Sequence, residues 1–171
     1  MSDSTSSTGD SPPTRDRAPW GMQVFGLLAW IGLTFMGASI GALLGNDPSW
    51  YQAITKPDWA PPGWVYGAVW TVLYITMATA AWLVWRQRGW CLGIGLYLVQ
   101  LIVNGLWTGL FFGLRRMDLA LVDMLVLLVL IGATGWAFRR DSRLAAALLA
   151  PYFVWVCFAT YLTITLIRLN S

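Results

Sequence analysis

Five long apolar stretches, separated by polar segments, dominate the sequence. They cover residues 21–45, 62–85, 90–114, 117–138 and 144–168. Each is long enough to form a helix that crosses a bilayer, which needs about 20 residues. The connections are short except for residues 46–61, so consecutive helices are expected to be antiparallel neighbours. The pattern predicts an all-α integral membrane protein, a five-transmembrane-helix bundle whose one long loop can fold over its end.

The composition agrees with this class. Only 11% of the residues are charged and 57% are hydrophobic, whereas a soluble domain has about a quarter of its residues charged. Residues 1–19 differ, being rich in Ser, Thr, Asp, Pro and Arg with no apolar core of a signal peptide. We expect a disordered N-terminal tail at 1–19 and one membrane domain at 20–171.

The basic residues predict an orientation. Seven basic residues share the N-terminal side, namely Arg15, Arg17, Arg86, Arg88, Arg139, Arg140 and Arg143. Four share the other side, namely Lys56, Arg115, Arg116 and Arg168. Short cytoplasmic loops retain basic residues, so the N-terminus is predicted to be cytoplasmic. Arginines at helix ends also account for the net charge of +3, and no nucleic-acid partner is expected.

Residue types needed for several kinds of chemistry are missing. The sequence contains no histidine, so no Ser-His or Cys-His nucleophile can be built. Cys91 and Cys157 lie in apolar surroundings without CxxC spacing, which predicts neither a disulfide framework nor a metal site. We expect no metal, no required cofactor and no hydrolytic activity.

The segment at residues 56–74 is unusually rich in proline and aromatic residues. Proline suits the first turn of a helix and not its interior, so a helix is expected to start near Pro62. Downstream, Tyr66, Trp70 and Tyr74 recur at helical spacing and form one aromatic stripe, continued by Met77 and Ala81. The stripe predicts either a cavity wall or core packing, with some tryptophans anchored at the lipid headgroups.

Small residues recur at every fourth position in two stretches. The repeats are Gly37, Gly41 and Gly45 in the first stretch, and Gly105, Gly109 and Gly113 in the third. Such tandem GxxxG patterns let helix backbones approach closely in a membrane. One or both are expected to be contact faces, either within the bundle or between protomers.

Polar residues inside the spans are costly and usually face a partner or a cavity. Gln100 and Asn104 share a helical face with Trp107 and Phe111, which favours either interhelical hydrogen bonds or a ligand contact. Asp123 lies about two turns into the fourth span, and a structural pair with Arg115 or Arg116 is favoured over a ligand contact.

Depth in the membrane brings several of these residues together. A helix rises about 1.5 Å per residue. The halves of spans two, three and five that are nearest the long loop therefore lie in the same leaflet, beneath that loop. The residues concerned are Trp70, Tyr74, Asn104, Trp107, Trp155 and Ala159. They predict an aromatic-walled cavity with a few polar groups and a lid, which is the usual form of a small-molecule site.

The same segments resemble a known family. Pro57, Trp59, Pro61, Pro62, Trp64, Trp70 and Tyr74 match the signature of the TspO/MBR family, the tryptophan-rich sensory proteins related to the mitochondrial translocator protein. QLIVNGLWTGLFFG and PYFVWVCFATYL are similar to its motifs in helices 3 and 5. The resemblance covers roughly residues 22–170, outside the N-terminal tail.

The resemblance implies a ligand, a set of contacts and an assembly. The implied ligand contacts are Tyr51, Pro61, Trp70, Tyr74, Asn104, Trp155 and Ala159. The family binds porphyrins, and several members bind sterols. It also implies homodimers that use helix 3, which favours Gly105, Gly109 and Gly113 as the contact between protomers. We expect a bacterial cell membrane as the location.

Three functions follow as hypotheses. The first is a membrane-embedded binding protein or sensor for porphyrins and other lipophilic ligands, which regulates tetrapyrrole or stress responses. The second is an enzyme that promotes light-dependent oxidative degradation of protoporphyrin, with Trp70 and Trp155 as redox neighbours. The third is a transporter of porphyrins or sterols, against which the absence of a repeat counts. Arg168 lies one residue too far from Tyr161 for the proposed sterol pattern.

Overall fold

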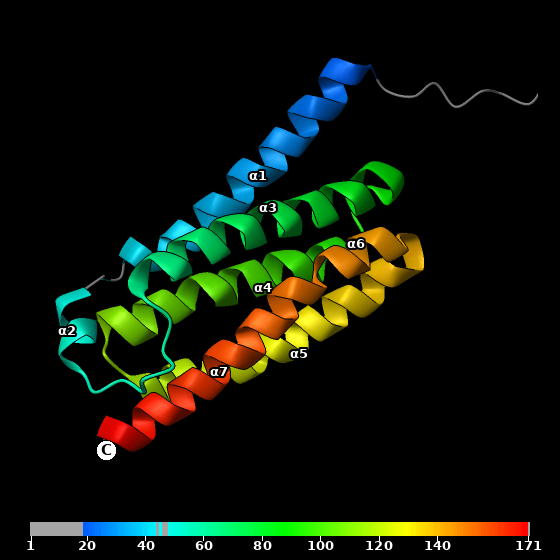
Figure 1. The fold of residues 1–171 in the computed structure, drawn as a ribbon. Coiled ribbons are helices and arrows are strands. Elements are labelled where there is room, and N and C mark those ends of the chain that lie inside the picture. The colour runs from blue at the N-terminus through cyan, green and yellow to red at the C-terminus, as the bar shows by residue number, and fades with distance from the viewer. Residues whose placement is uncertain (1–18, 44, 46–47, 171) are drawn as a thin grey trace, which may run out of the picture.

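The computed structural model describes residues 19–43, 45 and 48–170 and is a bundle of long helices (Figure 1). In chain order the helices are α1 (Trp20–Leu43), α2 (Pro48–Ala53), α3 (Gly63–Arg88), α4 (Leu92–Thr108), the π-helical segment η1 (Gly109–Gly113), α5 (Met117–Asp141), α6 (Arg143–Leu148) and α7 (Ala150–Asn170). Five apolar segments within the described residues are long enough to cross a membrane, which confirms the predicted five spans. The predicted disordered tail lies outside the described residues, apart from Pro19.

Two of the five spans are interrupted, which the hydrophobic pattern did not predict. The third span changes from α-helix to π-helix at Gly109. The fifth span breaks at Leu149, between α6 and α7. Pro151 explains this break, because its ring would clash with the carbonyl of Ala147 in a continuous helix and its nitrogen has no hydrogen to donate. Leu149 instead donates to the Ala146 carbonyl at 3.2 Å, which closes α6 with a tighter turn.

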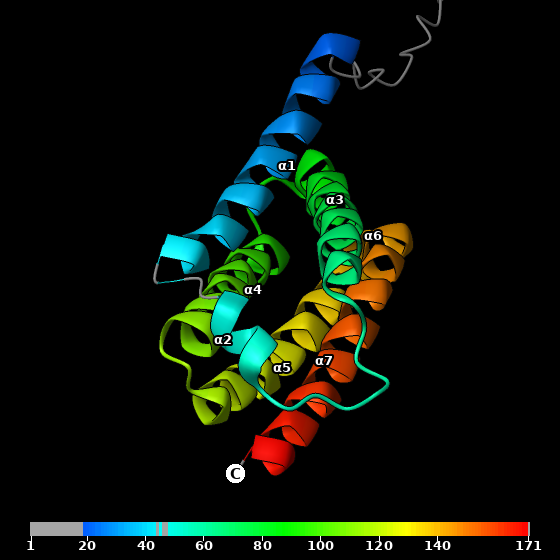
Figure 2. The same ribbon diagram turned by 60° about the vertical axis from the view of Figure 1, so that its left-hand side comes forward.

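The long loop contains a helix of its own. Residues 46–61 were predicted as a loop, but Pro48–Ala53 form the short helix α2. Figure 2 shows α2 and the chain that follows it crossing one end of the bundle. This arrangement confirms that the long connection folds over the end of the helices, on the side where the C-terminus also lies.

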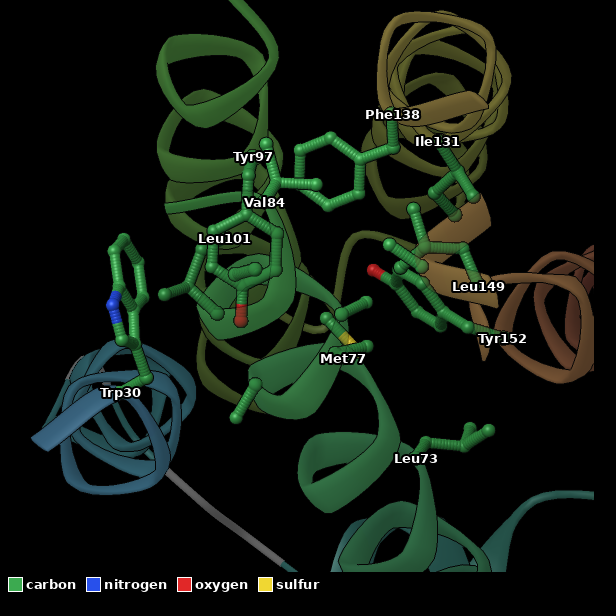
Figure 3. Packing of buried hydrophobic residues seen from close by; sticks show 14 of the residues in the cluster. Trp30, Leu73, Met77, Val84, Tyr97, Leu101, Ile131, Phe138, Leu149 and Tyr152 are labelled. Carbon is green, nitrogen blue, oxygen red and sulfur yellow. The ribbon is translucent and has the colours of Figure 1, made fainter. Parts of the chain in front are cut away.

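Side chains from several helices form the core. Tyr97 on α4 lies between Trp30 of α1, at a ring-centroid distance of 5.8 Å, and Phe138 of α5, at 6.3 Å. Figure 3 shows these rings together with Met77 of α3 and Tyr152 of α7. The Tyr97 hydroxyl is also 2.6 Å from the Thr34 hydroxyl, and both residues are fully buried. This core holds α1, α3, α4, α5 and α7 together. The predicted cavity lies outside it, toward the end of the bundle that α2 covers.

The two glycine repeats pack against each other within the chain. A Cβ added to Gly41 would lie 1.8 Å from the Gly105 carbonyl oxygen, and one added to Gly105 would lie 2.6 Å from the Gly37 carbonyl oxygen. Gly45 likewise faces Gly113, at 2.9 Å from added Cβ to Cα. Backbone therefore meets backbone between α1 and the α4–η1 segment, as small residues permit.

This packing confirms that the two repeats are contact faces within the bundle, whereas a contact between protomers through Gly105, Gly109 and Gly113 stays a prediction. Gly105 and Gly109 are buried in the single chain, and α1 occupies the face that Gly105 presents. The sequence could not separate the two possibilities, because a GxxxG pattern is the same whether the second helix is in the same chain or in another copy. The homodimer itself also stays a prediction.

Candidate functional site

A cavity of about 300 Å³ lies between α3, α4, η1, α5 and α7, next to α2. Its walls are mainly aromatic and aliphatic, with a few hydroxyl and amide groups. The lining residues are Tyr51, Tyr66, Trp70, Tyr74, Asn104, Trp107, Thr108, Phe111, Phe112, Met124, Leu127, Trp155, Val156, Ala159, Leu162, Thr163 and Leu166. No Asp, Glu, Lys or Arg is among these described residues, so fixed charges do not face the cavity.

The structure brings most of the predicted contact residues to this one cavity. Seven of the eight line it, namely Tyr51, Trp70, Tyr74, Asn104, Trp107, Trp155 and Ala159. Pro61 does not line it. It precedes Pro62, the N-cap residue of α3, and its contact with a ligand stays a prediction.

The wall on α3 is built from stacked rings. Trp70 and Tyr74 are one helical turn apart and stack with a centroid distance of 5.2 Å and an interplanar angle of 29°. Tyr66 lies one turn earlier and makes an edge contact with Trp155 of α7 at 6.0 Å. These contacts hold the rings in fixed orientations, because each ring packs on another ring and not on a flexible side chain.

A second wall of the cavity includes the π-helical segment. Trp107 stacks on Phe111 at 5.1 Å with an angle of 20°, and Phe112 contacts Phe111 edge-on at 4.9 Å. Phe111 and Phe112 both line the cavity from this segment, and single π-helical turns within α-helices are frequent at functional sites. Glycines at both ends of η1 leave room for this geometry.

The lid segment, residues 48–61, covers the cavity through α2 and the chain after it. Tyr51 contacts Phe111 at 6.0 Å and Phe112 at 5.8 Å, and its hydroxyl is 3.3 Å from that of Tyr66. Farther along, the Asn170 side chain donates to the Thr55 carbonyl and accepts from the Thr55 amide, both at 2.9 Å. These two hydrogen bonds attach the lid segment to the end of α7.

A few buried polar atoms on cavity-lining residues, or on residues about one helical turn from them, lack complete hydrogen bonding. The Tyr74 hydroxyl donates to Asn104 Oδ1 over a long 3.4 Å. Among the described residues, Trp107 Nε1, Tyr152 Oη and both amide atoms of Gln100 have no hydrogen-bond partner within 3.5 Å. Of the two amides for which an interhelical hydrogen bond was one alternative, Asn104 accepts one from Tyr74, and Gln100 makes none among the described residues. Buried polar atoms are normally satisfied, so this region is suited to the polar groups of a ligand or to water.

Asp123 does not pair with the arginines at the start of α5, which corrects the sequence-based expectation. Arg116 instead forms a bidentate pair with Asp118, at 2.8 Å and 2.6 Å. These hydrogen bonds raise the pKa of Arg116 above its usual value. The Asp123 Oδ2 atom is buried and has no hydrogen-bond partner among the described residues. Asp118 is next to the turn that carries Arg116, so it competes successfully for the guanidinium.

Sequence reasoning missed the contributions of α5 and of the second half of α7. Met124 and Leu127 of α5 line the cavity, although no motif distinguishes them from other apolar residues. On α7, Leu162 and Leu166 continue the face of Trp155 and Ala159 at spacings of three and four. This helical spacing could have identified Leu162 and Leu166 as cavity residues from the sequence. Thr163 also lines the cavity and donates to the Ala159 carbonyl at 2.9 Å.

Comparison with known proteins agrees with the fold and with the aromatic motifs. The TspO/MBR family model matches residues 20–169, which is nearly all of the described chain. The chain belongs to the TspO/MBR family. Together with the five apolar spans, this membership makes it a multi-pass integral membrane protein.

Relatives from this family come from bacteria and animals. The chain is 38% identical over 154 residues to the tryptophan-rich protein TspO of Chlorobaculum tepidum, covering 86% of this chain and 98% of the relative. It is 41% identical over 143 residues to the tryptophan-rich sensory protein of Cereibacter sphaeroides, covering 81% and 90%. It is 39% identical over 142 residues to the human translocator protein, covering 79% and 84%. The relatives' names describe sensory and translocator proteins.

Proposed function

We propose that this TspO/MBR protein is a membrane-embedded binding protein for porphyrins and related flat lipophilic molecules, and that it acts as a sensor of tetrapyrroles. The observation that carries the proposal is a cavity lined by two stacked aromatic pairs from different helices. Trp70 and Tyr74 form one pair, and Trp107 and Phe111 form the other. A flat conjugated ring gains most from aromatic faces that are already oriented.

The polar atoms around the cavity fit a ligand that is apolar in the middle and polar at its edge. Lys56 offers a cation at the lid, with Nζ 5.0 Å from the centre of the Tyr51 ring. Its ammonium now donates to the carbonyls of Gln52 and Ile54, at 3.1 Å and 3.0 Å. A propionate of a porphyrin could replace these acceptors with a stronger, charge-assisted hydrogen bond.

Entry of a tetrapyrrole requires the lid segment to move. A volume of about 300 Å³ is at the small end of the range for small-molecule sites, so a porphyrin needs more room than the closed cavity supplies. The Tyr51 contacts with Phe111 and Phe112 are the ones that must open. We therefore expect bound porphyrin to change hydrogen exchange in residues 48–56 more than anywhere in α5.

The experiment that tests the proposal is a titration of purified protein with protoporphyrin, haem and cholesterol in the dark. Binding is followed by quenching of tryptophan fluorescence, with the Ala159→Phe variant as a control whose cavity is filled. Saturable quenching by the porphyrins that is lost in the variant supports the proposal. Equal quenching of the variant would refute the cavity as the binding site. Cholesterol serves as the flat lipophilic ligand without an aromatic ring.

A second function, light-dependent oxidation of bound protoporphyrin by dioxygen, is favoured by one observation. Trp70 and Trp155 both line the cavity, so two readily oxidised rings would lie next to the bound macrocycle. Illumination of the same samples separates the two functions. New absorbing products that disappear in Trp70→Phe, while dark binding persists, would identify an enzyme. Unchanged absorption under light would leave a binding protein.

A further inference from the structure

We infer that the end of the bundle opposite α2 binds the phosphate headgroup of an anionic glycerophospholipid, at a site formed by Arg139, Arg140 and Arg143. A hollow of about 760 Å³ lies at the junction of α5 and α6, lined by these three arginines together with Trp136, Ala146 and Ala147. Figure 1 shows this junction at the far end of the bundle from α2 and the C-terminus. The site is therefore separate from the porphyrin cavity.

The three arginines lack an internal counter-charge. Within the part of the chain that the structure describes, Arg139 and Arg143 form no ion pair. The acidic residue beside them, Asp141, is already bound to Arg88 at 2.8 Å, and only 11% of its side chain is exposed. Three like charges within five residues repel one another, and an external anion would relieve this repulsion.

The geometry of the arginines suits a phosphate. The Arg140 guanidinium stacks on the Trp136 indole with its central carbon 3.8 Å from the ring centroid. Stacking occupies the face of the guanidinium and leaves its N–H edge free for bidentate hydrogen bonds, which match phosphate oxygens. Trp136 itself is exposed one turn before Arg140, as expected for a tryptophan at the membrane–water interface.

An apolar groove continues from this hollow along the outer surface of the bundle, which favours a lipid over a free phosphate ion. The groove lies between α3 and α6–α7, and Ala147 lines both the hollow and the groove. At its far end are Val154 and Phe158. From Ala147 to Phe158 the helical rise is roughly 16 Å, close to the depth of one leaflet, about 15 Å. The groove therefore offers an acyl chain a path below the headgroup.

Native mass spectrometry of the full-length protein tests the inference. Phosphatidylglycerol and phosphatidylcholine with identical acyl chains are titrated separately into the purified protein. We expect phosphatidylglycerol to bind at least about tenfold more tightly, because basic pockets at this depth select anionic headgroups. Equal affinity for both lipids would overturn the inference. Displacement of phosphatidylglycerol by millimolar inorganic phosphate would overturn the lipid assignment and identify a phosphate-ion site.

Variants locate the site. Arg140→Gln/Arg143→Gln is expected to weaken phosphatidylglycerol binding about 30-fold, from the contribution of two basic residues near an anionic headgroup. Arg143→Gln alone is expected to weaken it about fivefold. The matched control is Arg86→Gln, which removes a charge from the same side, where Arg86 stacks on Trp82 at 4.4 Å. Equal weakening in Arg86→Gln and Arg143→Gln would refute a defined site.

A substitution that keeps every charge tests the acyl path. Ala147 is exposed at the point where the hollow meets the groove, so Ala147→Phe should not disturb the core. It is expected to weaken phosphatidylglycerol binding severalfold by blocking the passage between headgroup and acyl chain. Unchanged affinity would refute the acyl path. This variant also remains informative if the double arginine variant fails to fold.

Discussion

The close approach of α1 and α4 makes a sharp prediction about Gly41. In Gly41→Ala the new methyl group would lie 1.8 Å from the Gly105 carbonyl oxygen and 2.9 Å from the Thr108 Cβ. Real Cβ atoms do not come closer than 3.0 Å to such atoms, so the two backbones must separate by more than 1 Å. Backbone cannot rotate away as a side chain can. We therefore expect Gly41→Ala to lower the free energy of unfolding by about 3 kcal/mol, the upper end of the range for an overpacked core.

Two other glycines of α1 supply a graded comparison. A Cβ at Gly37 would lie 2.7 Å from Leu101 Cγ, a side-chain atom that can move. We expect Gly37→Ala to cost about 1 kcal/mol. A Cβ at Gly32 would have nothing within 4 Å, so Gly32→Ala should not destabilise the protein and should stabilise α1 by about 0.5–1 kcal/mol through helix propensity. All three variants make the same chemical change in one helix, so helix propensity cancels in the comparison.

The assay is the free energy of unfolding in mixed micelles, obtained by titration with a denaturing detergent and followed by tryptophan fluorescence. The expected order of destabilisation is Gly41→Ala, then Gly37→Ala, then Gly32→Ala. Equal stability of Gly41→Ala and Gly32→Ala would refute the close contact between α1 and α4. If Gly41→Ala or Gly105→Ala instead kept its stability and lost a homodimer in crosslinking, the glycines would be contacts between protomers after all.

Three further predictions test the cavity, the lid segment and the core. Ala159→Phe is expected to abolish porphyrin binding and to cost less than about 1 kcal/mol of stability, because the ring enters empty space; a large stability loss with full affinity would contradict the site. Asn170→Ala is expected to raise hydrogen exchange at Thr55 roughly tenfold, since two hydrogen bonds are lost; unchanged exchange would show that α7 does not hold the lid segment. Thr34→Val should cost about 1–3 kcal/mol by leaving the buried Tyr97 hydroxyl without its partner, with porphyrin affinity unchanged as the check that the core and the site are separate.

Sequence alone determined the spans, the start of α3 and seven of the seventeen residues that line the cavity. Spans can be read from sequence because the bilayer imposes a length and an apolar composition on each helix independently of its neighbours. Pro62 stands at the N-cap of α3 because proline restricts its own backbone. Trp70, Tyr74 and Asn104 meet in one cavity because depth follows from helical rise and chain direction.

Only the tertiary structure decided what each helix face meets. Rotation of a helix about its axis depends on packing against all of its neighbours at once, and the sequence pattern leaves that angle open. Hence the glycine repeats could pair within the chain or between chains, and the structure places Gly41 against Gly105. The folded arrangement also decided two further points for the same reason. It places Met124 in the cavity wall, and it gives Arg116 the partner Asp118 and not Asp123.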